Sequence, residues 1–140
     1  MREPPPIPDD SLQDCLRDQY GLDLAIIEFL PVGLDSRAGG YRVTPTAGEP
    51  LLVKVKSGQF YEPGCLVPAW LREQGIAEVV APLSTTSHAL WASVAEWTVI
   101  AYPYIEGDTS WRGMNDAQWV SVGDTFKRIH TLSLPATGIP

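Results

Sequence analysis

The amino-acid sequence predicts an α+β domain in which an antiparallel sheet of about five strands carries one packed helix and is flanked by a helix at each end. Short β-type runs, broken by turn residues, fill the middle of the chain. Segments with helical spacing precede, interrupt and follow these runs. The chain has 140 residues, which is enough for one domain with a core of its own.

The N-terminal part predicts an extended segment followed by a short helix. Prolines crowd residues 1–8, and we expect a flexible lead-in there because proline continues neither a helix nor a strand ladder. The next three residues offer N-cap side chains, namely Asp9, Asp10 and Ser11. Apolar residues then recur at helical spacing up to Tyr20, and Gly21 is the expected stop.

Three strands are predicted next, at Ala25–Val32, Tyr41–Thr46 and Leu51–Ser57. Residues 47–50 form a simple hairpin turn between the second and third strands. The first connection, Gly33–Gly40, is long for a strand connection and is flanked by glycine. This length suggests that the loop has a functional role.

A helix and a second hairpin complete the predicted sheet. The helix covers roughly residues 64–74, with Pro68 tolerated if it lies in the first turn and Gly75 as the stop. Two further strands follow, at Ala89–Val94 and Trp97–Tyr102. A proline directly after the last strand ends its ladder.

The clearest helix is the last one. Asn115 and Gln118 have the spacing of a capping box. One apolar stripe follows, formed by Trp119, Val122, Phe126 and Ile129. We expect this helix to end near Leu132, and the composition of residues 133–140 is typical of a linker.

Composition and charge argue against several classes of protein. No apolar run approaches the ~20 residues that span a bilayer, and no signal peptide opens the chain, so we expect a cytoplasmic protein without a membrane partner. The net charge of −7 disfavours nucleic acid as a partner. Cys15 and Cys65 lie far apart without ligand spacing, which argues against a zinc site or a disulfide scaffold.

One predicted strand carries the residues with the most chemistry. Its period of two places Leu52, Lys54 and Lys56 on one face and two valines on the other. In kinases, a lysine on the third strand reaches the α- and β-phosphates of ATP. Leu52 is then placed to contact the adenine base. The alternative is that both lysines are solvated charges on an edge-facing strand.

Several segments carry a family resemblance, namely Phe29–Val43, Leu51–Gly58, Leu71–Ile76, Ala81–Leu83, Ala101–Gly107 and Asp116–His130. Together they resemble the aminoglycoside phosphotransferase superfamily, which has a protein-kinase-like fold, and its spectinomycin-phosphotransferase-like branch in particular. The resemblance covers nearly the whole chain from about Leu22. It implies a nucleotide-binding N-terminal lobe with its hinge at residues 9–107, and a linker and first helix at residues 108–140 that lead toward a C-terminal lobe.

The resemblance makes the Gly33–Gly40 loop the nucleotide-covering loop. Gly33, Asp35 and Ser36 are then expected at the phosphates, where free backbone N–H groups and the serine hydroxyl can approach phosphate oxygens. Lys54 is the expected phosphate ligand. A plain hairpin connection is the alternative interpretation of the loop.

The resemblance also implies a carboxylate for the lysine and a hinge for the adenine base. Glu62 aligns with the acidic residue of the family and Glu73 is its competitor, although a glutamate at a helix N-terminus is also common on surfaces. At the hinge Pro103 has no N–H, so we expect backbone contacts from Tyr102 and Tyr104. Both tyrosines could equally be packing residues.

The catalytic residues of the family are not found in this chain. Phosphoryl transfer needs an aspartate at the acceptor hydroxyl and Asn and Asp ligands for magnesium. The family carries them in its C-terminal lobe, beginning with a His-x-Asp motif, and no such motif occurs between Met1 and Pro140.

We therefore expect ATP with Mg²⁺ as cofactor, and as partner a C-terminal kinase lobe on another chain or in downstream sequence. The chain alone is expected to be inactive. The alternatives are a non-catalytic nucleotide-binding or regulatory module and an inert remnant of such a kinase.

Overall fold

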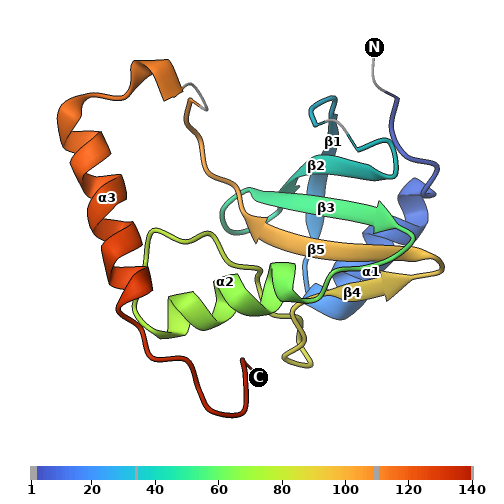
Figure 1. The fold of residues 1–140 in the computed structure, drawn as a ribbon. Coiled ribbons are helices and arrows are strands. Elements are labelled where there is room, and N and C mark those ends of the chain that lie inside the picture. The colour runs from blue at the N-terminus through green and yellow to red at the C-terminus, as the bar shows by residue number, and fades with distance from the viewer. Residues whose placement is uncertain (1–2, 34, 109–110, 140) are drawn as a thin grey trace.

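A computed structural model describes residues 3–33, 35–108 and 111–139 of the chain (Figure 1). It contains a five-stranded antiparallel sheet in the order β1-β2-β3-β5-β4. In chain order the elements are α1 (Asp9–Tyr20), β1 (Leu24–Leu30), β2 (Ala38–Pro45), β3 (Leu51–Ser57), α2 (Pro63–Glu73), β4 (Ala92–Val94), β5 (Trp97–Pro103), the short 3₁₀ helix η1 (Trp111–Gly113) and α3 (Asp116–His130). This architecture confirms the predicted fold class.

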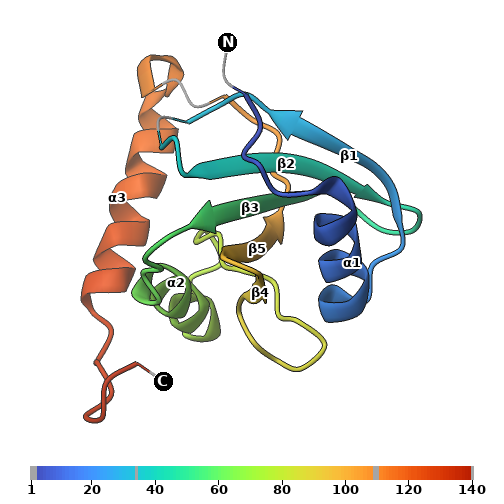
Figure 2. The same cartoon turned by 90° about the vertical axis from the view of Figure 1, so that its right-hand side faces the viewer.

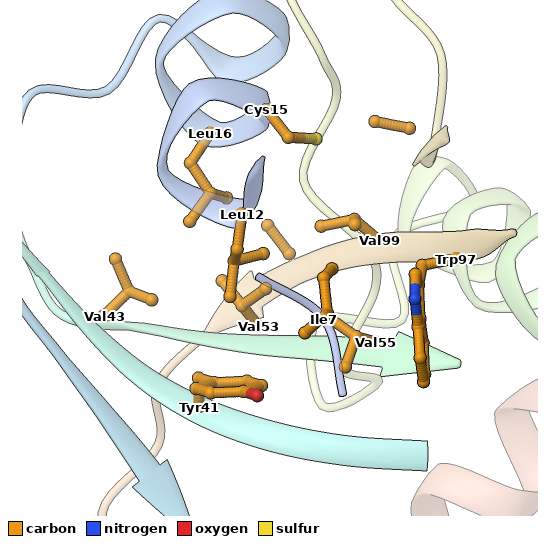
Figure 3. Close-up of a cluster of buried hydrophobic side chains, with 12 residues drawn as sticks. Ile7, Leu12, Cys15, Leu16, Tyr41, Val43, Val53, Val55, Trp97 and Val99 are labelled. Atoms are coloured by element: carbon orange, nitrogen blue, oxygen red, sulfur yellow. The ribbon is translucent and has the colours of Figure 1, made fainter. Parts of the chain in front are cut away.

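The core lies between α1 and one face of the sheet. Figure 2 shows α1 on one side of the sheet and the helices α2 and α3 on the other. Alternate residues of β2 and β3 point toward α1, and Val43, Val53 and Val55 are fully buried there (Figure 3). Leu12 and Leu16 meet them from α1 at helical spacing. The core and α1 therefore cover only one face of the sheet.

The N-terminal segment is packed, so the prediction of a flexible lead-in is wrong for residues 3–8. Pro5 is buried, and Ile7 is only 5% exposed and belongs to the core cluster. A Cβ atom built on Gly39 would lie 2.6 Å from Cδ of Pro5, so the proline ring packs on the backbone of β2 at a position that has no side chain.

The ends of α1 agree with the sequence in part. Pro8 occupies the N-cap position without a side-chain bond, so Asp9 and Asp10 lie in the first turn of the helix instead of capping it. There their negative charges interact favourably with the positive end of the helix dipole. Gly21 has φ 67° and donates its N–H to the Arg17 carbonyl, which confirms the predicted stop.

The strands differ most from the prediction at the starts of β2 and β4, and β1 ends at Leu30 rather than Val32. β2 begins at Ala38 rather than Tyr41, because Gly39 and Gly40 already pair with Val55 and Lys54 of β3. The predicted loop is therefore shorter than Gly33–Gly40. β4 begins later than predicted, since Ala89 donates its N–H to the Thr85 hydroxyl in a turn.

Helix α2 contains a proline that the sequence analysis placed differently. Pro68 lies inside the helix and not in its first turn. Proline has no N–H, so the Gly64 carbonyl lacks its α-helical donor. Gly75, with φ 87°, confirms the predicted stop.

Helix α3 has the predicted start, and its predicted apolar stripe is not buried. Asn115 and Gln118 exchange side-chain to backbone hydrogen bonds of 2.9 and 2.8 Å, which confirms the capping box. None of the described side chains of α3 is buried, and Phe126 is 56% exposed. An ion pair between Arg128 and Glu78 connects α3 to the segment after α2. No helix in the described part of the chain has the length and apolar character needed to cross a membrane.

Candidate functional site

The face of the sheet opposite α1 carries the predicted lysine. Along β3, Val53 and Val55 are buried against the core, whereas Lys54 between them is exposed. The strand alternates because successive side chains point to opposite faces. Since Lys54 pairs with Gly40 on one side and Ile100 on the other, these three residues share the face opposite the core.

A cavity of about 320 Å³ lies on this face beside the loop between β1 and β2. Four of the residues predicted for the site line it, namely Gly33, Asp35, Leu52 and Lys54. The remaining lining residues are Val32, Ala38, Gly39, Gly40, Val55, Lys56 and Ile100. Most of the wall is thus aliphatic side chain and glycine backbone, and charged groups of both signs are present.

Lys54 lies beside an aromatic ring. Its Nζ is 5.1 Å from the centre of the Tyr102 ring, at cation–π distance. The thiol of Cys65, from α2, is adjacent: burial raises its pKa, while a hydrogen bond with Tyr102 and the charge of Lys54 act in the opposite direction. Tyr102 therefore links Lys54 to the helix, through its ring and its hydroxyl.

The structure does not bring either predicted carboxylate to Lys54. Glu62 is the exposed N-cap residue of α2, and Glu73 lies exposed at the other end of that helix. None of the ion pairs within the described residues involves Lys54, Glu62 or Glu73. Pro63 and Gly64 start the helix directly after Glu62, which fixes that residue at the helix entrance.

The loop residues fall into two groups. Asp35 accepts the Arg37 backbone N–H at Oδ1 (2.9 Å) and lies 3.7 Å from Lys56 Nζ at Oδ2, and these contacts lower its pKa, the Arg37 bond most. Ser36 is exposed in the turn and does not line the cavity. Leu34, inside the predicted loop, lies outside the described residues.

The backbone groups predicted for the adenine edge are engaged within the sheet. The Tyr104 N–H donates to the Pro50 carbonyl at 3.1 Å. Hydrogen-bonded pairs alternate along an antiparallel ladder, so the next such pair is Leu52 with Tyr102. The same alternation turns the Pro103 carbonyl to the opposite side of β5. The ladder register, which decides this, is not encoded in the local sequence.

Arg42 is a further residue of this face that the sequence analysis missed. It pairs with Leu52, its guanidinium lies 4.8 Å from the centre of the Tyr104 ring, and it forms a 3.6 Å ion pair with Glu106. The side chain thus crosses β3 and ties β2 to the segment after β5. Its signal was present in the sequence, as an arginine between the core-facing Tyr41 and Val43.

Two other hollows, each lined in part by α2, suit an anion less well. One, of about 320 Å³, is lined by Arg72 but also by Glu73 and Glu78. The other, of about 530 Å³, is lined by Glu73 and His88, and its lining contains neither lysine nor arginine. Within the described residues, no three His, Cys, Asp or Glu side chains gather as a metal site would require.

Comparison with known proteins finds similarity to solved structures. No protein-family profile matches the chain, and no curated protein sequence does. A solved structure of spectinomycin phosphotransferase APH(9)-Ia, in complex with ADP and spectinomycin, superposes with a TM-score of 0.80 at 27% identity over 94% of this chain. This chain has the fold of a kinase-like N-terminal lobe.

The AMP-bound structure of the same enzyme supports this lobe fold, with a TM-score of 0.78 at 24% identity over 94% of this chain. In both comparisons the matched part is 40% of the solved chain. The kinase-like lobe described here therefore corresponds to less than half of that phosphotransferase.

Proposed function

We propose that this chain is the nucleotide-binding lobe of an ATP-dependent small-molecule O-phosphotransferase. The observation that carries the proposal is the position of Lys54, which lines one cavity together with Gly33 and Asp35 of the loop between β1 and β2. This loop is called the glycine loop below. The lobe fold is shared with a phosphotransferase whose structures contain ADP or AMP. In that setting a third-strand lysine binds the phosphates of the nucleotide.

Each part of the cavity has a role in this proposal. Leu52 and Ile100 offer apolar surface to the base, and Lys54 offers its charge to the phosphates. At Gly33 the backbone has φ 92°, a conformation that glycine adopts without strain, so its peptide groups can approach the phosphates closely. Tyr102 orients Lys54 through the cation–π contact.

The remaining chemistry would come from a C-terminal lobe. The described residues offer no cluster that could hold Mg²⁺, so we place the metal ligands and the catalytic aspartate in that lobe. In this proposal residues 9–107 are the nucleotide-binding lobe with its hinge, and residues 108–140 are the linker and first helix toward the second lobe. The exposed apolar side chains of α3 support this division.

Titration with nucleotide tests the proposed function. We expect the protein to bind ADP and ATP in calorimetry, and Lys54→Ala to weaken ADP binding about tenfold or more, because a charge-assisted contact to phosphate is lost. The free energy of unfolding of this variant should stay within about 1 kcal/mol of wild type, since Lys54 is exposed and loses only its cation–π contact with Tyr102. Lys127→Ala, an exposed lysine of α3, is the matched control. Equal ADP affinity in wild type and Lys54→Ala would remove Lys54 from the site.

A non-catalytic nucleotide-binding module is the second candidate. The absence of an ion pair at Lys54 within the described residues favours it, because kinases need a Lys–Glu pair in place for transfer. Addition of a separately expressed C-terminal lobe of the spectinomycin phosphotransferase type distinguishes the two. Phosphate transfer from ATP in the mixture supports the kinase lobe, and binding without transfer supports the module.

A further inference from the structure

A second lysine lies in the same cavity as Lys54. Lys56 is two residues further along β3 on the same face, and both lysines line the 320 Å³ cavity. Two residues along a strand correspond to about 7 Å between Cα atoms. The cavity therefore has two neighbouring ammonium groups. A chain of two phosphate groups can span the distance between them more easily than a single phosphate group can.

Lys56 already has an acidic partner, and that partner belongs to the glycine loop. Asp35 Oδ2 lies 3.7 Å from Lys56 Nζ, and both side chains are partly exposed, at 46% and 39%. Ion pairs at this degree of exposure are weak, because water competes for both charges. An incoming anion with higher charge can therefore replace the carboxylate at low cost.

The loop that carries Asp35 is fastened to the end of β3. The Ala38 N–H donates to the Asp35 carbonyl (3.2 Å), and the Ser57 N–H donates to the Arg37 carbonyl (2.9 Å). Asp35 Oδ1 holds the Arg37 N–H as well. These bonds keep the Asp35 carboxylate at the cavity wall, where a phosphate bound to Lys54 would meet its negative charge.

We propose that Lys56 is a second phosphate-binding lysine, and that Asp35 is an internal counter-ion which a nucleotide phosphate replaces on binding. This inference rests on the proposed function and deepens it. It predicts a preference for nucleotides long enough to reach both lysines. Di- and triphosphates should gain from Lys56, whereas a monophosphate that reaches Lys54 gains little.

Calorimetric titration of ADP and AMP into matched variants tests the inference. We expect Lys56→Ala to weaken ADP binding about tenfold, as for the loss of one charge-assisted contact, and to change AMP binding less than threefold. Asp35→Asn keeps an oxygen that can accept the Arg37 N–H, so the turn is retained while the charge is removed. This variant should bind ADP more tightly than wild type, by about two- to fivefold.

Lys127→Ala again serves as the control for a general loss of positive charge, and thermal unfolding of each variant checks that the fold is kept. If Lys56→Ala binds ADP like wild type while Lys54→Ala does not, the inference fails and the proposed function stands. Tighter or unchanged ADP binding by Lys56→Ala together with weaker binding by Asp35→Asn would also overturn it. If wild type binds neither ADP nor ATP at millimolar concentration, both the inference and the proposed function fail.

Discussion

At the residue scale, Lys54 is held by an aromatic ring and not by a carboxylate. The Tyr102 ring lies 5.1 Å below its ammonium group, and the buried Cys65 thiol is next to the ring. A cation–π contact of an exposed lysine is worth about 0.5–1 kcal/mol, so the ammonium group remains available to an anion. The side chain is oriented without being neutralised, which suits a phosphate ligand.

The buried thiols predict a loss of stability at alkaline pH. Burial raises the pKa of Cys15 from 9.0 to about 11. A group whose pKa is higher in the folded state contributes stability that is complete below its unfolded pKa and is lost as pH rises toward the folded value. The free energy of unfolding, measured with a chemical denaturant, should therefore decrease by about 1 kcal/mol between pH 8 and pH 10.

Cys15→Ala isolates this effect. The variant loses some packing at both pH values, because Cys15 is buried against the core, but its decrease between pH 8 and pH 10 should be smaller than that of wild type. Tyr20 and Tyr102, whose pKa values burial raises to about 12, act at higher pH in both proteins. If the free energy of unfolding decreases equally in wild type and Cys15→Ala between pH 8 and pH 10, the pKa of the Cys15 thiol is not raised by folding.

The sequence predicted residues well where a side chain's direction follows from the strand period. Leu52 and Lys54 share a face because they are two positions apart, and both line the cavity. Tyr104 was predicted from its place next to a proline, but the direction of its N–H depends on pairing with Pro50, which is 54 positions earlier in number. Lys56 lay on the predicted face, and only the fold shows that Asp35 reaches it.

At the element scale, β2 and the N-terminal segment depend on two adjacent glycines with different tasks. Gly39 is turned toward Pro5, where a Cβ atom would lie 2.6 Å from the proline ring. Gly40 shares the opposite face with Lys54, and its Cβ would meet Leu52 at an ordinary 3.8 Å. Gly39 thus allows the Pro5 ring to pack on β2, whereas Gly40 has no close contact, and both glycines line the cavity.

We predict that Gly39→Ala destabilises the protein by about 1–3 kcal/mol, because the Pro5 ring must move to admit the methyl group. Gly40→Ala is the matched control and should leave the stability within about 1 kcal/mol of wild type, since neither contact nor φ opposes it. Urea unfolding at neutral pH measures both. Equal losses in the two variants would mean that contact with Pro5 is not the cause.

Pro5→Ala gives a second check on that cause. With the ring atoms Cγ and Cδ removed, Gly39→Ala should cost less than it does in wild type, so the two substitutions should be non-additive.

The packing of this segment was not predictable from composition. A run of prolines reports on backbone conformation, and it does not reveal whether a neighbouring face is free to receive it. Ile7 is the single apolar residue between two prolines, yet it enters the core. The start of α3, by contrast, depends on contacts three residues apart, and its capping box was predictable for that reason.

At the scale of the whole molecule, α3 stands apart from the sheet (Figure 1). This helix is amphipathic, and Phe126 on its predicted apolar stripe is 56% exposed. The matched region is 40% of the solved phosphotransferase chain, so that enzyme has further structure beyond the matched region. An exposed apolar helix face is the kind of surface that associates with other protein.

We predict that the 140-residue chain self-associates through this stripe. Sedimentation over a range of concentrations should show dimers or larger species for wild type, and Phe126→Ser should shift the distribution toward monomer. Val120→Ser is the matched control, because Val120 is on the same helix and 71% exposed but lies off the stripe. Neither change should cost more than about 1 kcal/mol in unfolding, since both side chains are exposed. If Val120→Ser reduces association as much as Phe126→Ser, general hydrophobicity of the helix is responsible; if neither does, α3 is not the associating surface.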